Sequence, residues 1–407
     1  MLKVLAIFAL TYILISGQRL PKISIDRPTG SMIGAVLIVL TGVLTFEQAI
    51  EGIDFNTITL LLGMMILVTY LAIAGFLDFI SIRILQIAKN PFQLLVLVAF
   101  SSGILSALFV NDTIVLIYTP ILIRTIILAR LKPMPYLIVL ATASNIGSAA
   151  TIVGNPQNML IGMESKIPFL DFALHMLPIA FFGLIIDIAV VALIYRREIF
   201  NNGFTATLPQ PSVDEPLLRK TVLVVGLVLF GFLSDIIPIP LVAISGATIL
   251  LLLGSKLQAK VLHRVDWPLL FFFCNLFVVM HGVEKSGLAD AMFRQFSPLF
   301  QLTGYGFILG LGLFSVIGSN LVSNVPFVMM MLPFASKIGH DSIFWYTLAM
   351  SSTFAGNFTI IGSVANMIVV ESSRRAGIEI SFFEFFKVGA TVTLLTVLMG
   401  SAILSLH

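Results

Sequence analysis

Charged residues are scarce in this chain of 407 residues, and their scarcity is the first guide to its class. Only 11% of the residues are Asp, Glu, Lys or Arg, whereas a soluble domain carries about a quarter. Hydrophobic residues make up 58%, and the mean hydropathy is +1.07. Apolar runs near the ~20 residues that a bilayer-spanning helix needs recur from end to end. The composition therefore excludes an ordinary soluble protein and predicts a polytopic protein surrounded by the lipid bilayer.

Cysteine and phosphate-binding loops are also lacking. Cys274 is the sole cysteine, which excludes a disulfide framework and a multi-cysteine metal site. No Walker-type loop occurs, so we expect no use of ATP by this chain itself. The histidines show no metal-ligand spacing, and no nucleophile–base pattern occurs, so we predict no metal, no catalytic residues and no enzyme activity. The net charge of +3 mainly reflects residues that set topology, and we predict no nucleic-acid partner.

Hydropathy and helix breakers predict an all-α protein with about ten transmembrane helices. Two further apolar stretches, 91–131 and 306–339, are too long for one span, and each is interrupted by a polar cluster. These clusters are Asn111-Asp112-Thr113 and Ser323-Asn324-Val325-Pro326. We interpret both stretches as re-entrant helical hairpins, which enter the membrane and return on the same side. The predicted spans lie near residues 2–18, 31–47, 56–76, 134–163, 176–195, 218–236, 238–254, 267–284, 343–370 and 384–405.

The basic residues support the hairpins. With the N-terminus outside, 18 of the 23 basic residues fall on the inner side, as the positive-inside rule requires. A single crossing by 91–131 would reverse everything after it and scramble this bias. We therefore predict an inner (cell) membrane protein with its N-terminus outside. The inner set is Arg19, Lys22, Arg27, Arg83, Lys89, Arg124, Arg130, Lys132, Arg196, Arg197, Arg219, Lys220, Lys256, Lys260, Arg264, Arg374, Arg375 and Lys387.

The two halves of the chain resemble each other. Asp54 to Asp78 matches Asp266 to Asp290 at an offset of 212, which also places Asn111-Asp112 on Ser323-Asn324. Because the first copy enters from outside and the second from inside, the repeats are inverted, an arrangement used for alternating access. We predict an N-terminal half 1–195 with repeat 54–163, a cytoplasmic linker 196–217, and a C-terminal half 218–407 with inverted repeat 266–371.

Four polar, glycine-rich islands, two hairpin tips and two broken helices, carry the predicted chemistry. Backbone groups released at such depth must be buried in protein or line a wet cavity. Half-helix N-termini suit an anion, whereas half-helix C-termini and side-chain oxygens suit a small cation. Small polar residues can also merely pack helices closely, which is the alternative for any one of them. The predicted ion-coupling residues are Asn111, Asp112, Ser144 and Asn145, and the predicted substrate-binding residues are Thr113, Gly147, Thr151, Gly154, Asn155, Asn320, Ser323, Asn324, Asn357, Thr359, Gly362 and Ser363.

Asp112 is the most informative single residue. An acid inside an apolar hairpin is costly and marks a functional site by default. Its counterpart at an offset of 212 is the neutral Asn324, which suits one coupling site for H⁺ or Na⁺. The alternative is a carboxylate that caps the hairpin helices or pairs with a basic residue. Asp187, inside the apolar run 179–194, is a further acidic candidate.

At these islands the sequence resembles the ion transporter superfamily of ArsB-type arsenite permeases, NhaD-type sodium/proton antiporters, the melanosomal P protein and divalent anion/sodium symporters. Neither tip keeps the Ser-Asn-Thr triplet of the symporters. The phrase Asn111-Asp112 followed by Leu116 to Pro120 looks like the ArsB type, and Gly154 to Asn158 resembles the P protein and anion permeases. The resemblance spans essentially the whole chain and implies paired hairpins and broken helices in inverted repeats.

The leading hypothesis is a proton-coupled secondary transporter of a small inorganic or carboxylate anion or a metalloid oxyacid. Arsenite or antimonite efflux is its most specific form, and an elevator-like movement is expected. The resemblance also implies a soluble ATPase subunit as a partner if the chain is an arsenite permease. The alternatives are a sodium/proton antiporter and a sodium-coupled di- or tricarboxylate or sulfate symporter. We expect no cofactor beyond the coupling H⁺ or Na⁺, and either a monomer or a homodimer.

Overall fold

The computed structural model describes residues 1–16, 25–200, 213–338 and 342–406; the linker residues 201–212, Arg19, Lys22 and the last hairpin residue 339 lie outside these ranges. Every regular element within them is a helix. Eight described helices are long and apolar enough to cross a membrane, or nine if Ile239–Leu253 and Ser255–Leu262 form one bent span. The predicted all-α, polytopic membrane fold is confirmed.

Helices of the first half begin where capping residues and prolines favour a helix start. Asp26, Asn90 and Asn155 cap α2, α6 and α9, and each of these helices has a proline in its first two positions. The helices are α1 Leu2–Ser16, α2 Arg27–Leu40, α3 Phe46–Glu51, α4 Phe55–Ile73, α5 Phe76–Ile87, α6 Pro91–Leu108, α7 Asn111–Leu128, α8 Met134–Ser148, α9 Pro156–Ser165, α10 Phe169–Ile194 and α11 Arg196–Phe200.

The second half repeats this order. Asp214 and Asp266 cap α12 and α15, and Ser363 caps α20. The helices are α12 Glu215–Ser234, α13 Ile239–Leu253, η1 Ser255–Leu257, α14 Gln258–Leu262, α15 Trp267–Lys285, α16 Leu288–Phe300, α17 Gly304–Val322, α18 Asn324–Ile338, α19 Ser342–Ala355, η2 Ile360–Gly362, α20 Val364–Arg375 and α21 Phe382–Leu404.

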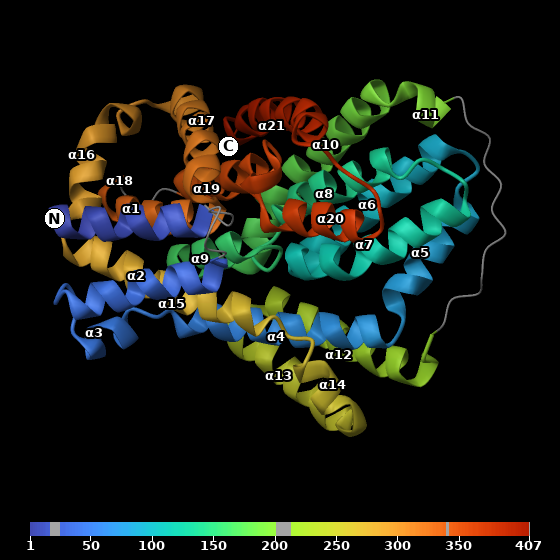
Figure 1. The fold of residues 1–407 in the computed structure, drawn as a ribbon, viewed down its shortest axis with the longest axis horizontal. Coiled ribbons are helices and arrows are strands. Elements are labelled where there is room, and N and C mark those ends of the chain that lie inside the picture. The colour runs from blue at the N-terminus through green and yellow to red at the C-terminus, as the bar shows by residue number, and fades with distance from the viewer. Residues whose placement is uncertain (17–24, 201–212, 339–341, 407) are drawn as a thin grey trace.

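Both predicted hairpins are present. Only Phe109 and Val110 separate α6 from α7, and only Ser323 separates α17 from α18. In Figure 1 the hairpin α6–α7 occupies the right half of the molecule and the hairpin α17–α18 the left half, so they enter from opposite sides. The two predicted long spans 134–163 and 343–370 are the broken pairs α8–α9 and α19–α20.

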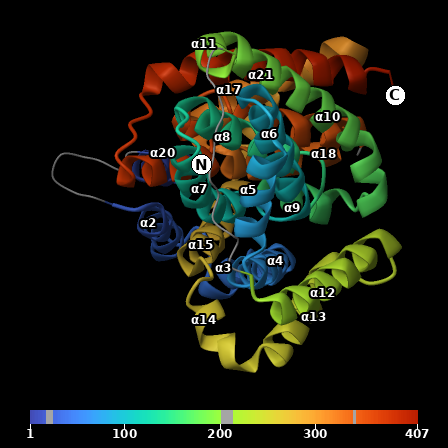
Figure 2. The same ribbon diagram turned by 90° about the vertical axis from the view of Figure 1, so that its right-hand side faces the viewer.

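The helices form two layers (Figures 1 and 2). We call α1–α4 with α12–α15 the scaffold layer, in which the largest packing surfaces join α13 to α4 and α15 to α2. We call α6–α10 with α17–α21 the core layer, in which α6 packs on α8, α17 on α19 and α10 on α21. Helices α5 and α16 connect the layers, and each begins after a glycine in the left-handed conformation, Gly75 (φ 83°) and Gly287 (φ 72°).

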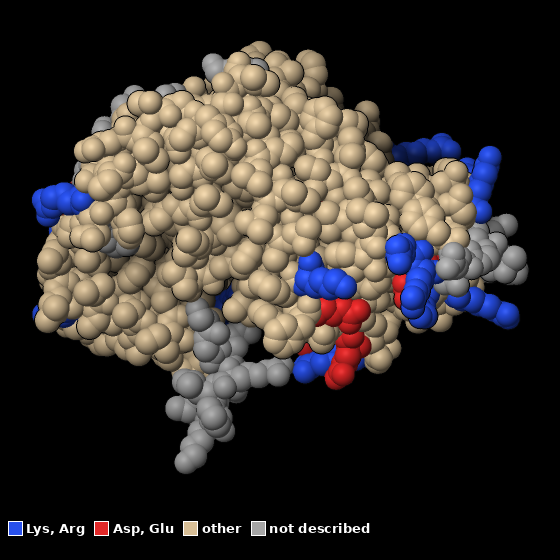
Figure 3. Space-filling model, turned by 90° about the horizontal axis from the view of Figure 1, so that it is seen from above, with Lys and Arg blue, Asp and Glu red and all other residues tan. Residues whose placement is uncertain are grey.

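The structural repeat is longer than the ranges 54–163 and 266–371. It runs from α1 to α10 and again from α12 to α21, since α2, α3 and α4 precede α13, α14 and α15 by 212 residues. Figure 3 shows a broad uncharged face, with Lys and Arg gathered mainly at one end of the molecule, the end that carries α5 and α11 in Figure 1. Such an uncharged belt fits the hydrocarbon layer of a bilayer.

Candidate functional site

Each broken helix is held open by one asparagine. Asn158 Nδ2 donates to the carbonyls of Ser148 (3.2 Å) and Thr151 (3.0 Å), which the end of α8 leaves without helical partners. Asn366, 208 residues later, donates in the same way to Gly356 (2.6 Å) and Thr359 (3.0 Å). The breaks are therefore built alike in both repeats, and an amide side chain satisfies carbonyls that could not face lipid.

Asn145 joins the two repeats at the centre of the core layer. Its Nδ2 donates to Asn357 Oδ1 (2.8 Å) and Asn366 Oδ1 (3.0 Å) of the second repeat. Its Oδ1 accepts from Asn111 Nδ2 (3.0 Å) and from the Ser363 hydroxyl (3.0 Å). We call Asn111, Asn145, Asn357, Ser363 and Asn366 the crossing network. All of its members are at least 95% buried.

Thr353 is the counterpart of Asn145 at an offset of 208, and its contacts are weaker. Its hydroxyl lies 3.2 Å from Asn155 Nδ2 and 3.4 Å from Asn158 Oδ1. The positions that Asn145 contacts, 363 and 366, are the counterparts of 155 and 158, so the pseudo-twofold relation holds at the level of single bonds. Gln157 Nε2 also lies 3.4 Å from the Thr353 hydroxyl, so each position makes three cross-repeat contacts. Those of Asn145, at 2.8–3.0 Å, are shorter than those of Thr353, at 3.2–3.4 Å, which makes the network asymmetric.

The hairpins dock onto the breaks by equivalent bonds. The Thr151 hydroxyl donates to the carbonyl of Ala107, and the Asn111 N–H donates to the carbonyl of Gly154 (2.9 Å). In the second repeat the Thr359 hydroxyl donates to Asn320 Oδ1 (2.9 Å). These bonds fix each hairpin tip against the helix break of its own repeat.

The two tips and the two breaks surround one cavity. Helices α7, α9, α18 and α20 all begin at it, because Asn111, Pro156, Asn324 and Val364 are among its lining residues. A volume of about 30 Å³ is open to the centres of water-sized molecules, room for about two waters. The positive ends of four helix dipoles therefore converge on one small cavity. The cavity is lined by Arg27, Asn111, Asp112, Pro156, Gln157, Leu269, Phe272, Phe273, Ser323, Asn324, Val325, Pro326, Ser363 and Val364.

Arg27 brings a full positive charge to the cavity from the scaffold layer. Its Nη2 contacts Met367 Sδ (3.5 Å), and its charge acts on the carboxyl of Asp112. The backbone N–H of Ala365, at the start of α20, also acts on that carboxyl. Arg27 Nε and Asn324 Oδ1 are buried without a hydrogen-bond partner among the described residues. A buried orphan donor and a buried orphan acceptor at one cavity indicate a ligand that can both accept and donate.

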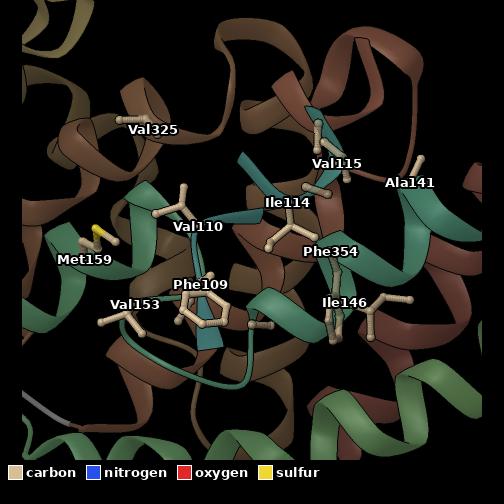
Figure 4. Close-up of a cluster of buried hydrophobic side chains, with 14 of the residues drawn as sticks. Phe109, Val110, Ile114, Val115, Ala141, Ile146, Val153, Met159, Val325 and Phe354 are labelled. Carbon is tan, nitrogen blue, oxygen red and sulfur yellow. The ribbon is translucent and has the colours of Figure 1, made fainter. Parts of the chain in front are cut away.

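Apolar side chains seal the first tip from its surroundings. Figure 4 shows Phe109, Val110 and Ile114 of the first hairpin among side chains from the broken helix α8–α9 and from the second repeat, including Val325 and Phe354. Phe109, Val110 and Ile114 are at most 3% exposed.

The structure corrects, by one residue, the alignment of the two hairpin tips that the sequence predicted. The first residues of α7 and α18, and their internal prolines Pro120 and Pro333, are 213 residues apart, not 212. Asn111 therefore corresponds to Asn324, and Asp112 corresponds to Val325 rather than to Asn324. The difference between the tips is a carboxyl in one and an isopropyl group in the other.

The predicted site residues fall into three groups. Asn111, Asp112, Ser323, Asn324 and Ser363 line the cavity. Asn145, Thr151, Gly154, Asn155, Asn320, Asn357 and Thr359 join the breaks and hairpins by hydrogen bonds, and Gly362 lies beside Asn320. Thr113, Ser144 and Gly147 form the third group.

The residues of the third group neither line the central cavity nor join the hairpins to the breaks. Thr113 lines a smaller space beside Asp112 with Arg264 and Asp266 of the scaffold layer. The Ser144 hydroxyl bonds back to the carbonyl of Ala141 within its own helix. A Cβ on Gly147 would lie 2.1 Å from the Gly103 carbonyl oxygen, so this glycine allows close packing of α6 and α8.

Sequence reasoning missed Arg27 and Gln157 at the cavity and Thr353 and Asn366 in the bonds between repeats. Asn366 belonged to a recognised island, and its 208-residue spacing from Asn158 was the available signal. Arg27 was counted among the inner basic residues of the topology argument. Nothing in its local sequence distinguishes an arginine that reaches a cavity from one that only sets the topology.

Comparison with known proteins agrees with this architecture. The family described as citrate transporter (CitMHS) matches residues 10–355. An uncharacterized transporter of Mycobacterium tuberculosis is 32% identical over 423 residues, covering 98% of this chain and 97% of that protein. A silicon efflux transporter of Oryza sativa subsp. japonica is 27% identical, covering 97% of this chain and 95% of that protein.

Two further similarities concern more distant proteins. The P protein of Homo sapiens is 26% identical over 92% of this chain, which spans 57% of that longer protein. The YdaH transporter of Alcanivorax borkumensis shares the fold, with a TM-score of 0.58 over 100% of this chain and 96% of that one, at 15% identity. Its likeness concerns the arrangement of helices alone.

Proposed function

The chain belongs to the citrate transporter family and is a multi-span secondary transporter, and on that premise we propose that it carries a small oxyanion or a hydroxylated oxyacid. In this proposal transport is coupled to the binding and release of protons at Asp112. Arsenite or antimonite is the most specific substrate of this class that we propose. The core layer, which holds the hairpins and breaks, moves against the scaffold layer during the cycle.

The observation that carries the proposal is the convergence of four helix N-termini and Arg27 on one small cavity. Each N-terminus contributes the partial positive charge of its helix dipole, which favours negatively charged ligands. Arg27 adds a guanidinium, the group best suited to bind oxyanions through paired hydrogen bonds. A site for a cation alone would not collect this much positive potential.

The orphan atoms narrow the class of ligand further. Arg27 Nε needs an acceptor, and Asn324 Oδ1 needs a donor. An oxyacid that carries both a charged oxygen and a hydroxyl supplies both. Citrate, named in the family description, and silicon, named in the rice relative, occur as hydroxylated acids of this kind. Thiolate ligation of arsenite is not part of the proposal, because Cys274 is not among the lining residues.

Asp112 supplies the coupling in this proposal. When it is ionised, its charge offsets that of Arg27 and weakens the binding of an anion. When it is protonated, Arg27 and the helix N-termini are left to bind the anion, so that proton and anion move together. An uncharged hydroxylated acid behaves oppositely, because the ionised carboxylate accepts a hydrogen bond from its hydroxyl more strongly than the protonated carboxyl does, and proton and substrate then alternate.

The test uses purified protein in liposomes with an imposed pH gradient. Arsenite, citrate, sulfate and silicic acid are supplied one at a time, with sodium and potassium buffers compared, while substrate flux and internal pH are recorded together. The proposal predicts saturable flux of at least one of these oxyacids that is driven by the pH gradient without Na⁺. Proton movement evoked by Na⁺ alone, with none of the oxyacids carried, would instead identify a sodium/proton antiporter and overturn it.

We also propose that the N-terminus lies outside. The end of the molecule where Lys and Arg gather in Figure 3 carries α11, with Arg196 and Arg197, and such an end faces the cytoplasm by the positive-inside rule. Labelling of single cysteines introduced at residues 2 and 198 with a membrane-impermeant reagent in intact cells tests this, with Cys274→Ser as the background. Labelling at 2 and none at 198 is expected.

A further inference from the structure

A second carboxyl, that of Asp187, is buried in the core layer away from the central cavity. It lies on α10 and has no exposed surface. Thr142 Oγ1 of α8 lies 2.8 Å and 2.9 Å from its two carboxyl oxygens. Thr142 is the sole hydrogen-bond partner of this carboxyl among the described residues, and no charge acts on it there. The mechanism proposed above does not use this residue.

The helices packed around α10 place no cation near Asp187. Helices α6, α8 and α19 contain no Asp, Glu, Lys or Arg, and their tyrosines Tyr136 and Tyr346 bind the Pro91 carbonyl and Asp171. The charged residues of α10 itself and of α11 are at least nine positions from residue 187 along the chain, and those of α12 and α21 lie within the first six residues of these helices. They are Asp171 and His175 of α10 itself, Arg196, Arg197 and Glu198 of α11, Glu215, Arg219 and Lys220 of α12, and Glu384 and Lys387 of α21.

The hydrogen bonds around Thr142 fit a protonated carboxyl. The hydroxyl of Thr142 has one hydrogen and lies 2.9 Å from the Ile138 carbonyl as well as beside Asp187. If Asp187 is protonated, its O–H donates to Thr142 Oγ1 and the Thr142 hydroxyl donates to Ile138, so every hydrogen is used. If Asp187 is ionised, a fully buried charge has one donor and no counter-ion, which costs several kcal/mol.

Asp187 is connected to the crossing network through one residue. The Thr142 carbonyl accepts a hydrogen bond from Asn357 Nδ2 (3.1 Å), whose Oδ1 accepts from Asn145. Asn145 in turn bonds to Asn111 at the first hairpin tip. The amides of this path keep their hydrogens, so the path transmits position between Asp187 and the helix break rather than a proton.

The second repeat shows that the fold does not require a carboxyl here. At the offsets of these helices, 208 and 213, Thr142 corresponds to Met350 and Asp187 to Gly400. A Cβ on Gly400 would lie 2.1 Å from Met350 Sδ, so the methionine fills the place that Asp187 and Thr142 fill in the first repeat. An apolar solution to the same packing problem exists in the same chain.

We propose that Asp187 is a second proton-binding site, whose proton holds Thr142, and through it Asn357, in the position seen here. Loss of this proton loosens the break between α19 and α20. The inference is independent of the substrate and of the role of Asp112, so it can fail or hold whatever becomes of the proposed function.

Infrared spectroscopy of the protein in lipid tests the protonation directly. Asp187→Asn keeps the shape of the side chain but cannot ionise. A C=O band of a protonated carboxyl is expected at neutral pH in the wild type, with a loss equivalent to one carboxyl in D187N. Asp112→Asn, measured alone and with D187N, separates the contribution of Asp112, and the half-exposed carboxyl of Asp171 on the same helix serves as the matched control in D171N. A spectrum unchanged by D187N would overturn the proposal.

Hydrogen exchange tests the coupling. Exchange of the segment 356–363 in alkaline medium is expected to be several-fold faster in the wild type than in D187N, compared at one pH so that chemical exchange rates cancel. The double variant Thr142→Met with Asp187→Gly, which copies the second repeat, is expected to match D187N while unfolding at the wild-type temperature. Equal exchange in all three proteins would overturn the proposal, because Asp187 would then be a packing residue only.

Discussion

The first and second repeats place hairpins and breaks alike, yet they differ in chemistry at three equivalent positions. Asp112 corresponds to Val325, Asn145 to Thr353 and Asp187 to Gly400. In each case the first repeat has the more polar residue. The backbone of both repeats therefore supplies the same helix N-termini and the same freed carbonyls, while both carboxyls that we propose as proton-binding sites lie in the first.

The largest effect is predicted for removal of the positive charge of Arg27 from the cavity between the repeats. Arg27→Gln leaves four helix N-termini but no full positive charge at the cavity, and a charge-assisted hydrogen bond contributes about 1.5–3 kcal/mol. The apparent affinity for the transported oxyanion should fall about 10- to 100-fold. Concentration-dependent uptake into liposomes measures this. Arg219→Gln, whose side chain is 83% exposed, is the control and should leave affinity unchanged.

Asn145 and Thr353 test whether the network is asymmetric in energy as well as in geometry. Asn145→Ala removes four hydrogen bonds and leaves buried amides without partners, so it should destabilise the protein by about 3 kcal/mol. Thr353→Val loses longer contacts and should cost about 1 kcal/mol. Thermal unfolding of both variants in detergent provides the comparison. Equal losses would mean that the two positions hold the repeats together equally.

The two connecting helices, α5 and α16, should respond alike to substitution of the glycine that precedes each of them. Gly75 and Gly287 have φ values of 83° and 72°, and an alanine in this conformation costs about 1–2 kcal/mol. If the chain bends at the starts of α5 and α16 as the core layer moves, Gly75→Ala and Gly287→Ala should each slow turnover roughly fivefold with little change in KM. Gly42→Ala has a similar φ of 70° within the scaffold layer and should not alter turnover. A slower Gly42→Ala protein would show that strain alone explains the effect.

The smallest effect is expected at Ser144. Its neighbour Asn145 is central to the network, but the Ser144 hydroxyl bonds only within its own helix. Ser144→Ala should therefore change transport less than twofold, as judged by initial rates in liposomes. A loss comparable to that of Asn145→Ala would place Ser144 in the site after all.

Sequence patterns were sufficient to predict the fold because polar residues that interrupt an apolar membrane-spanning stretch are easily recognised. Asn111-Asp112 and Ser323-Asn324 stand out against apolar runs, and both hairpins are present in the structure. The same hydropathy argument cannot detect short connecting helices such as α5 and α16, whose polar faces lower their mean hydropathy. Their left-handed glycines, Gly75 and Gly287, were noticed only as part of a repeated sequence.

The site was less predictable than the fold, for two physical reasons. Side-chain partners depend on which helices meet, so the bond from Asn145 to Asn366 has no local signal. The alignment of the two hairpin tips changes by one residue between the sequence and the structure. The spacing of Pro120 and Pro333 gives the structural alignment, whereas the spacing of the polar residues at the tips did not. Arg27 reaches the cavity from the other layer, which no pattern within one repeat could indicate.

The proton-binding role of Asp112 is the central claim, and one comparison tests it most directly. Asp112→Asn in liposomes should retain exchange of labelled for unlabelled oxyacid, because the helix N-termini and Arg27 remain, while accumulation driven by a pH gradient falls to background. Accumulation that continues undiminished in D112N would contradict the account, since the cavity would then be coupling transport without the one carboxyl that lines it.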